Sequence, residues 1–320
     1  MSDGRIETPI GLDTNHLPMQ RGSIDVTSLP GGIDLQATVE SGQSYLWDRE
    51  DGRMYERTAA SGGDAWYWTT VRVDGDLQVV RIRQTDGRLV WEATFDAADV
   101  LHTLLGLGDD LPAIRETAPP DAVVDEAYDA YWGMRIVCDP VFPTLVSFIC
   151  SAQMRVARIH GMQRALRREF GEPVAFDGGT YRAFPTPEAL ADASEAALRD
   201  LSLGYRAPYV KRTAEMVATG EADPEDARGL AYEDARDHLT QFVGVGEKVA
   251  DCILLFSLGY LEAVPLDTWI RTTIAEFYPD CDRGNYADTS RAIREALGGA
   301  YAGYTQTYLF HYLRSGGREL

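Results

Sequence analysis

The stretch Phe242-Val-Gly-Val-Gly-Glu-Lys-Val-Ala-Asp-Cys252 decides the fold of this chain. An apolar helix end, two closely spaced glycines and a new apolar helix predict a helix-hairpin-helix over about 231–258. Gly244 and Gly246 are expected to permit a turn that other residues would not readily adopt. Such a unit presents backbone N–H groups at a helix N-terminus, where phosphate binds well. A hairpin that binds the DNA backbone is therefore favoured over a plain helical hairpin.

Lys248 follows the second glycine, and Asp267 follows the run Val264-Pro-Leu. The helix dipole and partial burial would both disfavour a cation at Lys248, and a neutral amine is a nucleophile. Asp267 is an expected N-cap, a position that would hold its carboxylate rigidly. Lys248 could instead be a surface lysine that touches phosphate, and Asp267 could act as a cap alone. Position alone leaves both alternatives open.

The composition describes a globular chain with an unusual charge. Its 320 residues, 45% of them hydrophobic, suit one large domain or two of ordinary size. No apolar run reaches the roughly 18 residues of a membrane span. We therefore expect a soluble intracellular protein. If it acts on DNA, we expect it in the prokaryotic cytoplasm, associated with the nucleoid. The four cysteines are scattered without a CxxC pair, and we expect neither a metal nor an organic cofactor.

The formal net charge is −20, and only two of the 30 basic residues are lysines, Lys211 and Lys248. An acidic surface repels DNA and taken alone argues against nucleic-acid binding. Acid excess with arginine in place of lysine is, however, typical of halophilic proteins, where strong screening weakens long-range repulsion. We favour that interpretation over an ordinary acidic protein. DNA contact would then depend on local groups and short-range hydrogen bonds.

The patterns predict an α+β chain, with an antiparallel β-sheet domain packed on a larger all-α domain. Residues 1–22 are expected to form a flexible tail, 23–118 the sheet domain and 119–320 the helical domain, with Pro119-Pro120 at the boundary. Strands separated by Asp-Gly hairpin signals are expected over 66–73, 77–83 and 89–93. Helices are expected over 97–107, 122–134, 141–151, 155–170, 187–200, 206–219, 231–243, 247–258, 268–277, 287–297 and 301–314.

Gln306 and Phe310 are four residues apart and would share one helix face. An amide beside a ring can hold a base flipped out of a duplex, although ordinary core packing would give the same spacing. Gln153 and Arg158, at a helix start, could occupy the space that such a base leaves. Tyr205, next to Arg206, could act as a wedge in the duplex. The alternative for Gln153 and Arg158 is a simple helix start, and the alternative for Tyr205 is a simple loop.

From about Ile33 to its end, the chain resembles the helix-hairpin-helix DNA glycosylases, most closely the 8-oxoguanine DNA glycosylase/lyase branch. The resemblance rests on six runs that stand in family order. They are Ser41-Gly-Gln-Ser44, Phe148-Ile-Cys-Ser151, Leu203-Gly-Tyr-Arg-Ala207, Gly244-Val-Gly-Glu-Lys-Val-Ala-Asp-Cys252, Ala263-Val-Pro-Leu-Asp267 and Tyr301-Ala-Gly-Tyr-Thr-Gln306.

The resemblance implies roles for the candidate residues of the base site. Lys248 corresponds to the Schiff-base nucleophile and Asp267 to the essential carboxylate. The carbonyl of Gly42 would sense the protonated N7 of the oxidised base. Cys252 and Phe310 would sandwich the base between them. Gln306 would read its Watson–Crick edge.

For the DNA, the resemblance implies that Tyr205 is the wedge and that Arg158 and Arg206 contact the opposite cytosine. The backbone contact would come from the hairpin residues Gly244, Val245 and Gly246, which could also hold a structural cation.

Three features depart from the family pattern. Gln153 stands where the family usually has an asparagine. Trp269 stands near the position where the family has a histidine that contacts phosphate. The acidic composition departs from the usual basic one. These departures concern the opposite-base preference and the phosphate contacts more than the chemistry.

The function that the resemblance implies is excision of 8-oxoguanine from double-stranded DNA by a monomeric enzyme. The enzyme would form a lysine Schiff base and then nick the strand by β-elimination. One alternative is a monofunctional glycosylase for alkylated bases of the 3-methyladenine type, although such enzymes generally lack a lysine at the position of Lys248. The other is a non-catalytic DNA-damage-binding protein, which would need neither Lys248 nor Asp267.

The halophilic interpretation predicts that the free energy of unfolding rises as KCl is raised towards molar concentrations, because salt screens the repulsion among the excess carboxylates. Denaturant unfolding at a series of KCl concentrations measures this dependence. Full stability in dilute buffer would contradict the interpretation.

Overall fold

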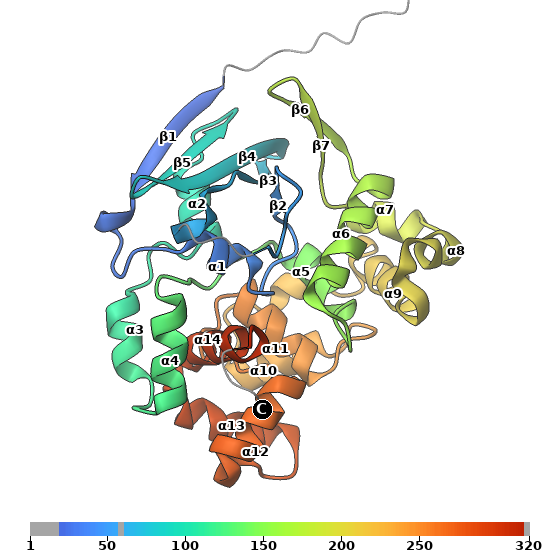
Figure 1. Cartoon of the computed structure of the whole chain (residues 1–320). Coiled ribbons are helices and arrows are strands. Elements are labelled where there is room, and N and C mark those ends of the chain that lie inside the picture. The colour runs from blue at the N-terminus through green and yellow to red at the C-terminus, as the bar shows by residue number, and fades with distance from the viewer. Residues whose placement is uncertain (1–18, 57–60, 317–320) are drawn as a thin grey trace, which may run out of the picture.

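A computed structural model describes residues 19–56 and 61–316, with a twisted sheet at one end and helices through the rest (Figure 1). The sheet is antiparallel, in the order β1-β5-β4-β3-β2. Its strands are β1 (Gln20–Asp25), β2 (Asp48–Arg49), β3 (Tyr67–Val73), β4 (Asp76–Thr85) and β5 (Arg88–Ala93). The predicted α+β class is confirmed.

Two Asp-Gly pairs make the predicted hairpins. Asp74-Gly75 joins β3 to β4 and Asp86-Gly87 joins β4 to β5, and all four residues have positive φ. Tight hairpins need this left-handed backbone, because it matches the twist of the strands.

The same signal at Asp177-Gly178 makes a third hairpin, between β6 (Pro173–Phe176) and β7 (Gly179–Arg182). The sequence analysis missed this hairpin inside a domain that it predicted to be all-α. Its strands are only four residues long and lie between two helices, which left too little alternation to detect.

The expected tail over 1–22 is too long at its end. Gln20 pairs with Ala93 and Gly22 with Trp91, so the last three residues of that segment belong to β1. Residues 1–18 lie outside the described part of the chain.

Two apolar clusters form the core. One lies between the sheet, α1 (Leu35–Glu40) and α2 (Ala98–Leu104), and its buried residues run from Leu29 to Leu107. The other fills the helical part and starts at Leu111, with Ala37 and Tyr45 added from the sheet side. The division at residue 118 stays a prediction, and the packing of Leu111 and Ile114 puts α3 on the helical side.

The helical part surrounds α11, which lies in the middle of Figure 1. All its residues from Val249 to Phe256 are buried, and it packs on α5 and α10. The helices are α3 (Leu111–Thr117), α4 (Ala122–Tyr131), α5 (Val141–Ile149), α6 (Val156–Phe170), α7 (Pro187–Asp192), α8 (Glu195–Leu198), α9 (Ala207–Ala218), α10 (Tyr232–Leu239), α11 (Glu247–Phe256), α12 (Thr268–Phe277), α13 (Tyr286–Ala296) and α14 (Ala302–Arg314).

One helix prediction is wrong, and two short helices were missed. The expected helix over 187–200 breaks at Ala193, because the hydroxyl of Ser194 accepts from Ala197 N–H and caps a new helix. The helices α1 and α3 were not predicted. Each has only six or seven residues, too few to establish a helical period. In the described residues, no helix is long and apolar enough to cross a membrane.

Arg135 joins the sheet part to the helical part. Its side chain is fully buried, and the guanidinium donates to the carbonyls of Pro30 and Gly32 at 2.9 and 2.8 Å. It also donates to the carbonyls of Gly106 and Asp109 at 2.7 and 3.0 Å. One buried cation therefore satisfies carbonyls in two segments that flank α1 and α2.

We expect Arg135→Met to lower the free energy of unfolding by about 3 kcal/mol or more, because it removes a charged donor from four partly buried hydrogen bonds to carbonyls. Denaturant unfolding measures the loss. Arg83→Met is the matched control, since Arg83 pairs with Asp64 at the surface, where such a pair contributes at most about 1 kcal/mol. Equal losses in the two variants would contradict the assigned role of Arg135.

Candidate active site

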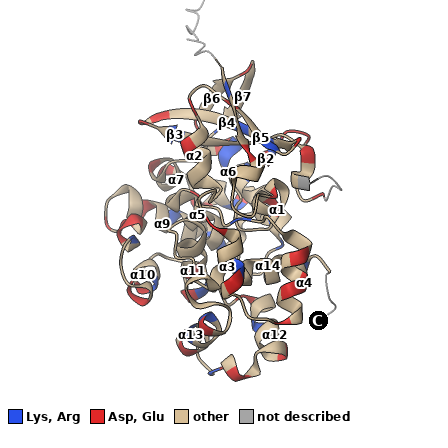
Figure 2. Cartoon of the chain, turned by 90° about the vertical axis from the view of Figure 1, so that its left-hand side faces the viewer, with Lys and Arg blue, Asp and Glu red and all other residues tan. Residues whose placement is uncertain are grey.

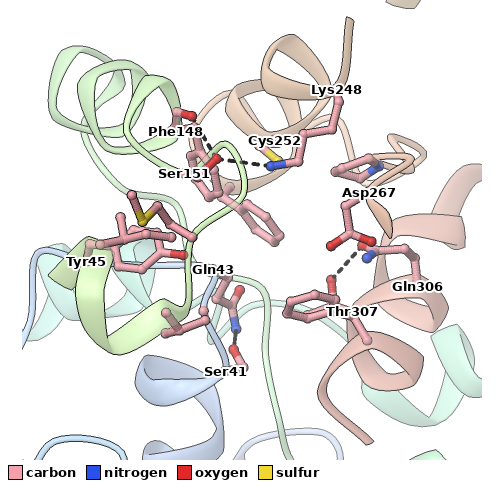
Figure 3. A pocket seen from close by; sticks show the side chains of 17 residues that line it. Ser41, Gln43, Tyr45, Phe148, Ser151, Lys248, Cys252, Asp267, Gln306 and Thr307 are labelled. Atoms are coloured by element: carbon pink, nitrogen blue, oxygen red, sulfur yellow. Dashed lines mark hydrogen bonds between the residues drawn. The ribbon is translucent and has the colours of Figure 1, made fainter. Parts of the chain in front are cut away.

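One pocket lies where the sheet part, α5, α6, α11, α12 and α14 meet (Figure 3). It brings together the six residues expected to catalyse or to hold a base, although they are spread over most of the chain. These are Gly42, Lys248, Cys252, Asp267, Gln306 and Phe310. The other lining residues are Ser41, Gln43, Tyr45, Phe148, Ser151, Met154, Val156, Ile159, Phe256, Pro265 and Thr307.

Two helices each present a pair of side chains spaced by one turn. Lys248 and Cys252 lie on α11, and Gln306 and Phe310 lie on α14. Residues four apart lie on the same helix face, so each pair enters the pocket together. The predicted shared face of Gln306 and Phe310 is confirmed.

Lys248 occupies the first turn of α11, as predicted, and is half-buried. Its Nζ donates to Ser151 Oγ at 3.1 Å and lies 5.5 Å from the centre of the Phe148 ring. Ser151 Oγ in turn donates to the carbonyl of Phe148 at 2.7 Å. The hydroxyl proton is thus engaged elsewhere, which leaves an oxygen lone pair for the amine.

Ser151 is a site residue that sequence reasoning missed. It belongs to the run Phe148-Ile-Cys-Ser151, which supported the family resemblance, but nothing in its local sequence pointed to Lys248. The other lysine, Lys211, lies elsewhere and donates to the carbonyls of Ala191 and Ala193. Of the two lysines, only Lys248 lines the pocket.

Asp267 is the N-cap of α12, as predicted, and its carboxylate accepts from Ile270 N–H at 2.9 Å. Burial raises the pKa of this carboxyl above its ordinary value, although the Ile270 N–H and Lys248 act in the opposite direction. A carboxylate fixed by a backbone hydrogen bond therefore lies in the same pocket as the amine (Figure 3).

The walls of the pocket suit a flat, partly apolar ligand. Burial raises the pKa of Cys252 to about 12, so it presents a neutral thiol. Phe310 is half-buried and supplies a ring. Gln306 is 4% exposed, and its Oε1 lies 3.3 Å from the hydroxyl of Thr307, which itself donates to the carbonyl of Gly303 at 2.7 Å.

The side chain of Gln43 holds the loop that carries Gly42 through three hydrogen bonds to backbone groups. The amide nitrogen of Gln43 donates to the carbonyls of Thr38 and Arg135, each at 2.8 Å. Its amide oxygen accepts from Val137 N–H at 2.9 Å. This buried side chain fixes the loop backbone against the segment before α5.

Gly42 itself has a φ of 99°, which a residue with a side chain rarely adopts. An added Cβ would also lie 2.9 Å from both Arg314 and Val156. Backbone conformation and close packing both require a glycine here.

The hairpin confirms only one of two glycine predictions. Gly244 has a φ of 89°, and a Cβ there would meet the side chain of Tyr209. Gly246, the N-cap of α11, has ordinary extended backbone at φ −99° and ψ 178°, so the turn itself does not require it. An added Cβ at Gly246 would meet nothing within 4 Å, and both Gly246 and Glu247 are exposed, so the N-terminus of α11 lies at the surface. The buried Val245 closes the turn between the two glycines.

Four of the five remaining DNA candidates are exposed. They are Gln153 and Arg158 beside the pocket-lining Met154 and Val156, Tyr205, which is 53% exposed, and Trp269 in the first turn of α12. Gln153 has a positive φ of 55°, so the turn before α6 projects it from the surface.

Arg206 does not match its expected position. It is 3% exposed, lies under the Tyr205 ring at 4.3 Å and donates to the carbonyl of Ala152. In this arrangement it supports the wedge candidate and the turn before α6 and does not reach solvent, so a contact with the opposite base stays a prediction.

The comparisons with known proteins agree with this geometry. Residues 146–298 match the model of the HhH-GPD superfamily base excision DNA repair protein. The probable N-glycosylase/DNA lyase of Methanothermobacter thermautotrophicus is 30% identical, over 90% of this chain and 95% of its own length.

Two solved structures share most of the fold. The structure of MBOgg1 with a low-affinity DNA ligand has a TM-score of 0.76 at 30% identity, covering 89% of this chain and 93% of that one. The Clostridium acetobutylicum 8-oxoguanine glycosylase/lyase, in complex with DNA that has cytosine opposite 8-oxoguanine, has a TM-score of 0.75 at 26% identity, with the same coverage. The chain belongs to the HhH-GPD superfamily of base excision DNA repair proteins, among relatives named N-glycosylase/DNA lyase.

Proposed function

We propose that this protein is a bifunctional DNA glycosylase and AP lyase that removes 8-oxoguanine from double-stranded DNA. The observation that carries the proposal is one pocket in which an amine and a capping carboxylate, Lys248 and Asp267, lie beside a thiol, a ring and an amide. The similarity to an 8-oxoguanine glycosylase/lyase supports the choice of base.

The base would leave the duplex and enter the pocket, with Cys252 and Phe310 on its two faces and Gln306 at its Watson–Crick edge. The carbonyl of Gly42 would accept from the protonated N7, the group that distinguishes the oxidised base from guanine. The packing around Gly42 supports this role, because the glycine backbone lies against Val156 and Arg314, and a side chain at this position would clash with them.

Lys248 would then attack C1′ of the sugar as a neutral amine and displace the base. The C1′–O4′ bond then breaks, with the proton of the attached amine passing to O4′, so the sugar opens and an imine links Lys248 to C1′. Removal of a proton from C2′ then expels the 3′ phosphate and nicks the strand. Asp267 would stabilise the positive charge that develops on the sugar. The hydrogen bond from Lys248 to Ser151 supports this chemistry, since it orients the amine before the base arrives.

The DNA backbone would contact the hairpin Gly244–Gly246, and Tyr205 would enter the duplex as a wedge. The exposed Gln153 and Arg158 would face the opposite strand. We propose a monomer that works on the chromosome in the cytoplasm, without a cofactor. A cation at the hairpin carbonyls also belongs to this proposal, and a halophilic origin would account for the acidic composition.

The first test is borohydride trapping at high salt on a duplex with 8-oxoguanine opposite cytosine. Borohydride reduces the imine, so the wild-type protein should give a covalent protein–DNA band. Lys248→Gln should lose both this band and strand nicking, while its affinity for the duplex persists, because only the nucleophile is removed.

Lys211→Gln is the matched control, since it removes the other lysine, which lies outside the pocket. Unchanged nicking by Lys248→Gln would rule out the amine mechanism. Base release without a trapped band would indicate a monofunctional glycosylase, and alkylated bases would then be tested.

Asp267→Asn should slow base excision about 100-fold or more, because the amide caps the helix but cannot stabilise a cation. The reaction requires the ionised carboxylate, whose pKa is raised by burial. The rate should therefore fall as the pH is lowered, with its acid limb above the ordinary pKa of an aspartate.

Single-turnover rates between acid and neutral pH measure this limb, and it should be absent from the residual activity of Asp267→Asn. An acid limb that persists in the variant would belong to another group. A near-normal rate in the variant would leave Asp267 as a helix cap only.

A further inference from the structure

We propose that the hydroxyl of Tyr286 is a positioning group that sets the place of Asp267 relative to the helix that carries Lys248. The proposal rests on the proposed function, because it concerns the same reaction. Tyr286 is the first residue of α13 and does not line the pocket. It acts through the backbone, and no part of it needs to touch the DNA.

One hydroxyl joins two segments of the site. Tyr286 donates to Asp251 Oδ2 at 2.6 Å, and it accepts from Leu266 N–H at 3.2 Å. Asp251 is on α11, three residues after Lys248 and next to Cys252. Leu266 directly precedes Asp267. The hydroxyl is therefore a two-bond bridge between the helix of the nucleophile and the turn of the carboxylate.

The direction of both hydrogen bonds is fixed. A backbone N–H can only donate, so the Tyr286 oxygen must accept from Leu266. A hydroxyl has a single proton, and the carboxylate of Asp251 receives it. Asp251 is fully buried and also accepts from Tyr232 at 2.6 Å, which fixes the orientation of the carboxylate.

Core packing of Leu266 and the helix cap made by Asp267 also hold the turn before Asp267, but neither is a hydrogen bond to α11 or α13. Asp267 N–H donates to the carbonyl of Pro265 at 2.9 Å, a bond within the same three residues. Leu266 is 3% exposed, so its N–H would lack water if the tyrosine oxygen were removed. The bond to Tyr286 is thus a directed hydrogen bond that links the backbone of this turn to α13.

The chain offers a matched pair of variants. Tyr286→Phe and Tyr232→Phe each remove one hydroxyl that donates to the same carboxylate at 2.6 Å, and each keeps the ring. Only Tyr286 also accepts from the turn before Asp267. The loss of a donor to Asp251 is common to both. The Tyr232 hydroxyl also lies 3.3 Å from Ser290 Oγ, so a larger defect in Tyr286→Phe than in Tyr232→Phe reports the contact with Leu266.

We expect Tyr286→Phe to reduce the single-turnover rate of 8-oxoguanine excision about tenfold to a hundredfold, because a small displacement of a catalytic group has effects of this size. Its affinity for the lesion duplex should stay within about twofold of wild type. Tyr232→Phe should lose much less of the excision rate than Tyr286→Phe, because it removes a donor to Asp251 and keeps the contact with Leu266. Thermal midpoints establish that both variants are folded. Equal excision rates in the two variants would overturn the proposal.

Amide hydrogen exchange supplies a readout that does not depend on activity. The amide of Leu266 should exchange slowly in the wild type and in Tyr232→Phe, and faster in Tyr286→Phe. Fast exchange at Leu266 in the wild-type protein would overturn the positioning contact whatever the activity. A wild-type protein that releases no 8-oxoguanine but protects Leu266 would contradict the proposed function and leave the contact standing.

Discussion

The buried carboxylate of Asp251 is the constraint on which the site depends. It has no exposed surface, and it accepts from Tyr232 on α10 and from Tyr286 on α13. Burial raises its pKa to about 6, while the two hydroxyls and the nearby Arg236 and Arg294 act in the opposite direction. A buried charge is tolerated only when its partners are correctly placed, so this group fixes α10, α11 and α13 relative to one another. The amine and the thiol of the pocket project from the helix held in this way.

The sheet part contributes to the pocket through its contacts with the helical part. Gln43 and Arg135 are buried polar side chains whose hydrogen bonds cross between the two parts. Ser44 adds a third crossing, since its hydroxyl donates to the buried Asp139 at 2.5 Å. Directed bonds of this kind fix a loop more narrowly than apolar packing does, because each polar group loses stability when it is displaced. The loop with Gly42 can therefore form one wall of a pocket whose other walls are helices.

An acidic protein can still bind DNA if a few groups contact the phosphates locally, while most of its basic side chains serve other purposes. Many arginines form ion pairs with carboxylates at the surface, as Arg21 does with Glu92 and Arg212 with Glu221. Figure 2 shows the basic and acidic positions interspersed over the helices and the sheet. A helix N-terminus and a few exposed side chains can bind phosphate locally without a basic net charge. Salt would then weaken the long-range repulsion while short hydrogen bonds persist.

The sequence by itself determined the parts of this protein whose signals are local. The hairpins at Asp74-Gly75 and Asp86-Gly87, the cap at Asp267 and the position of Lys248 in the first turn of its helix follow from neighbouring residues. Ordered motifs then added the family and the candidate residues of the pocket, and the pocket does contain that set. Predictions were wrong or incomplete where signals were short or ambiguous, as for the helix over 187–200 and for the hairpin at Asp177-Gly178.

Only the tertiary structure decided which polar groups meet across the chain. Ser151 accepts a hydrogen bond from Lys248, which lies 97 positions away in the chain. Arg206 donates to the carbonyl of Ala152. The hydroxyl of Tyr286 joins Asp251 to Leu266. Such contacts leave no periodic trace in the sequence, because a hydrogen bond needs one donor and one acceptor at a set distance and angle. Folding sets that distance and angle through the packing of whole helices, which no single motif encodes.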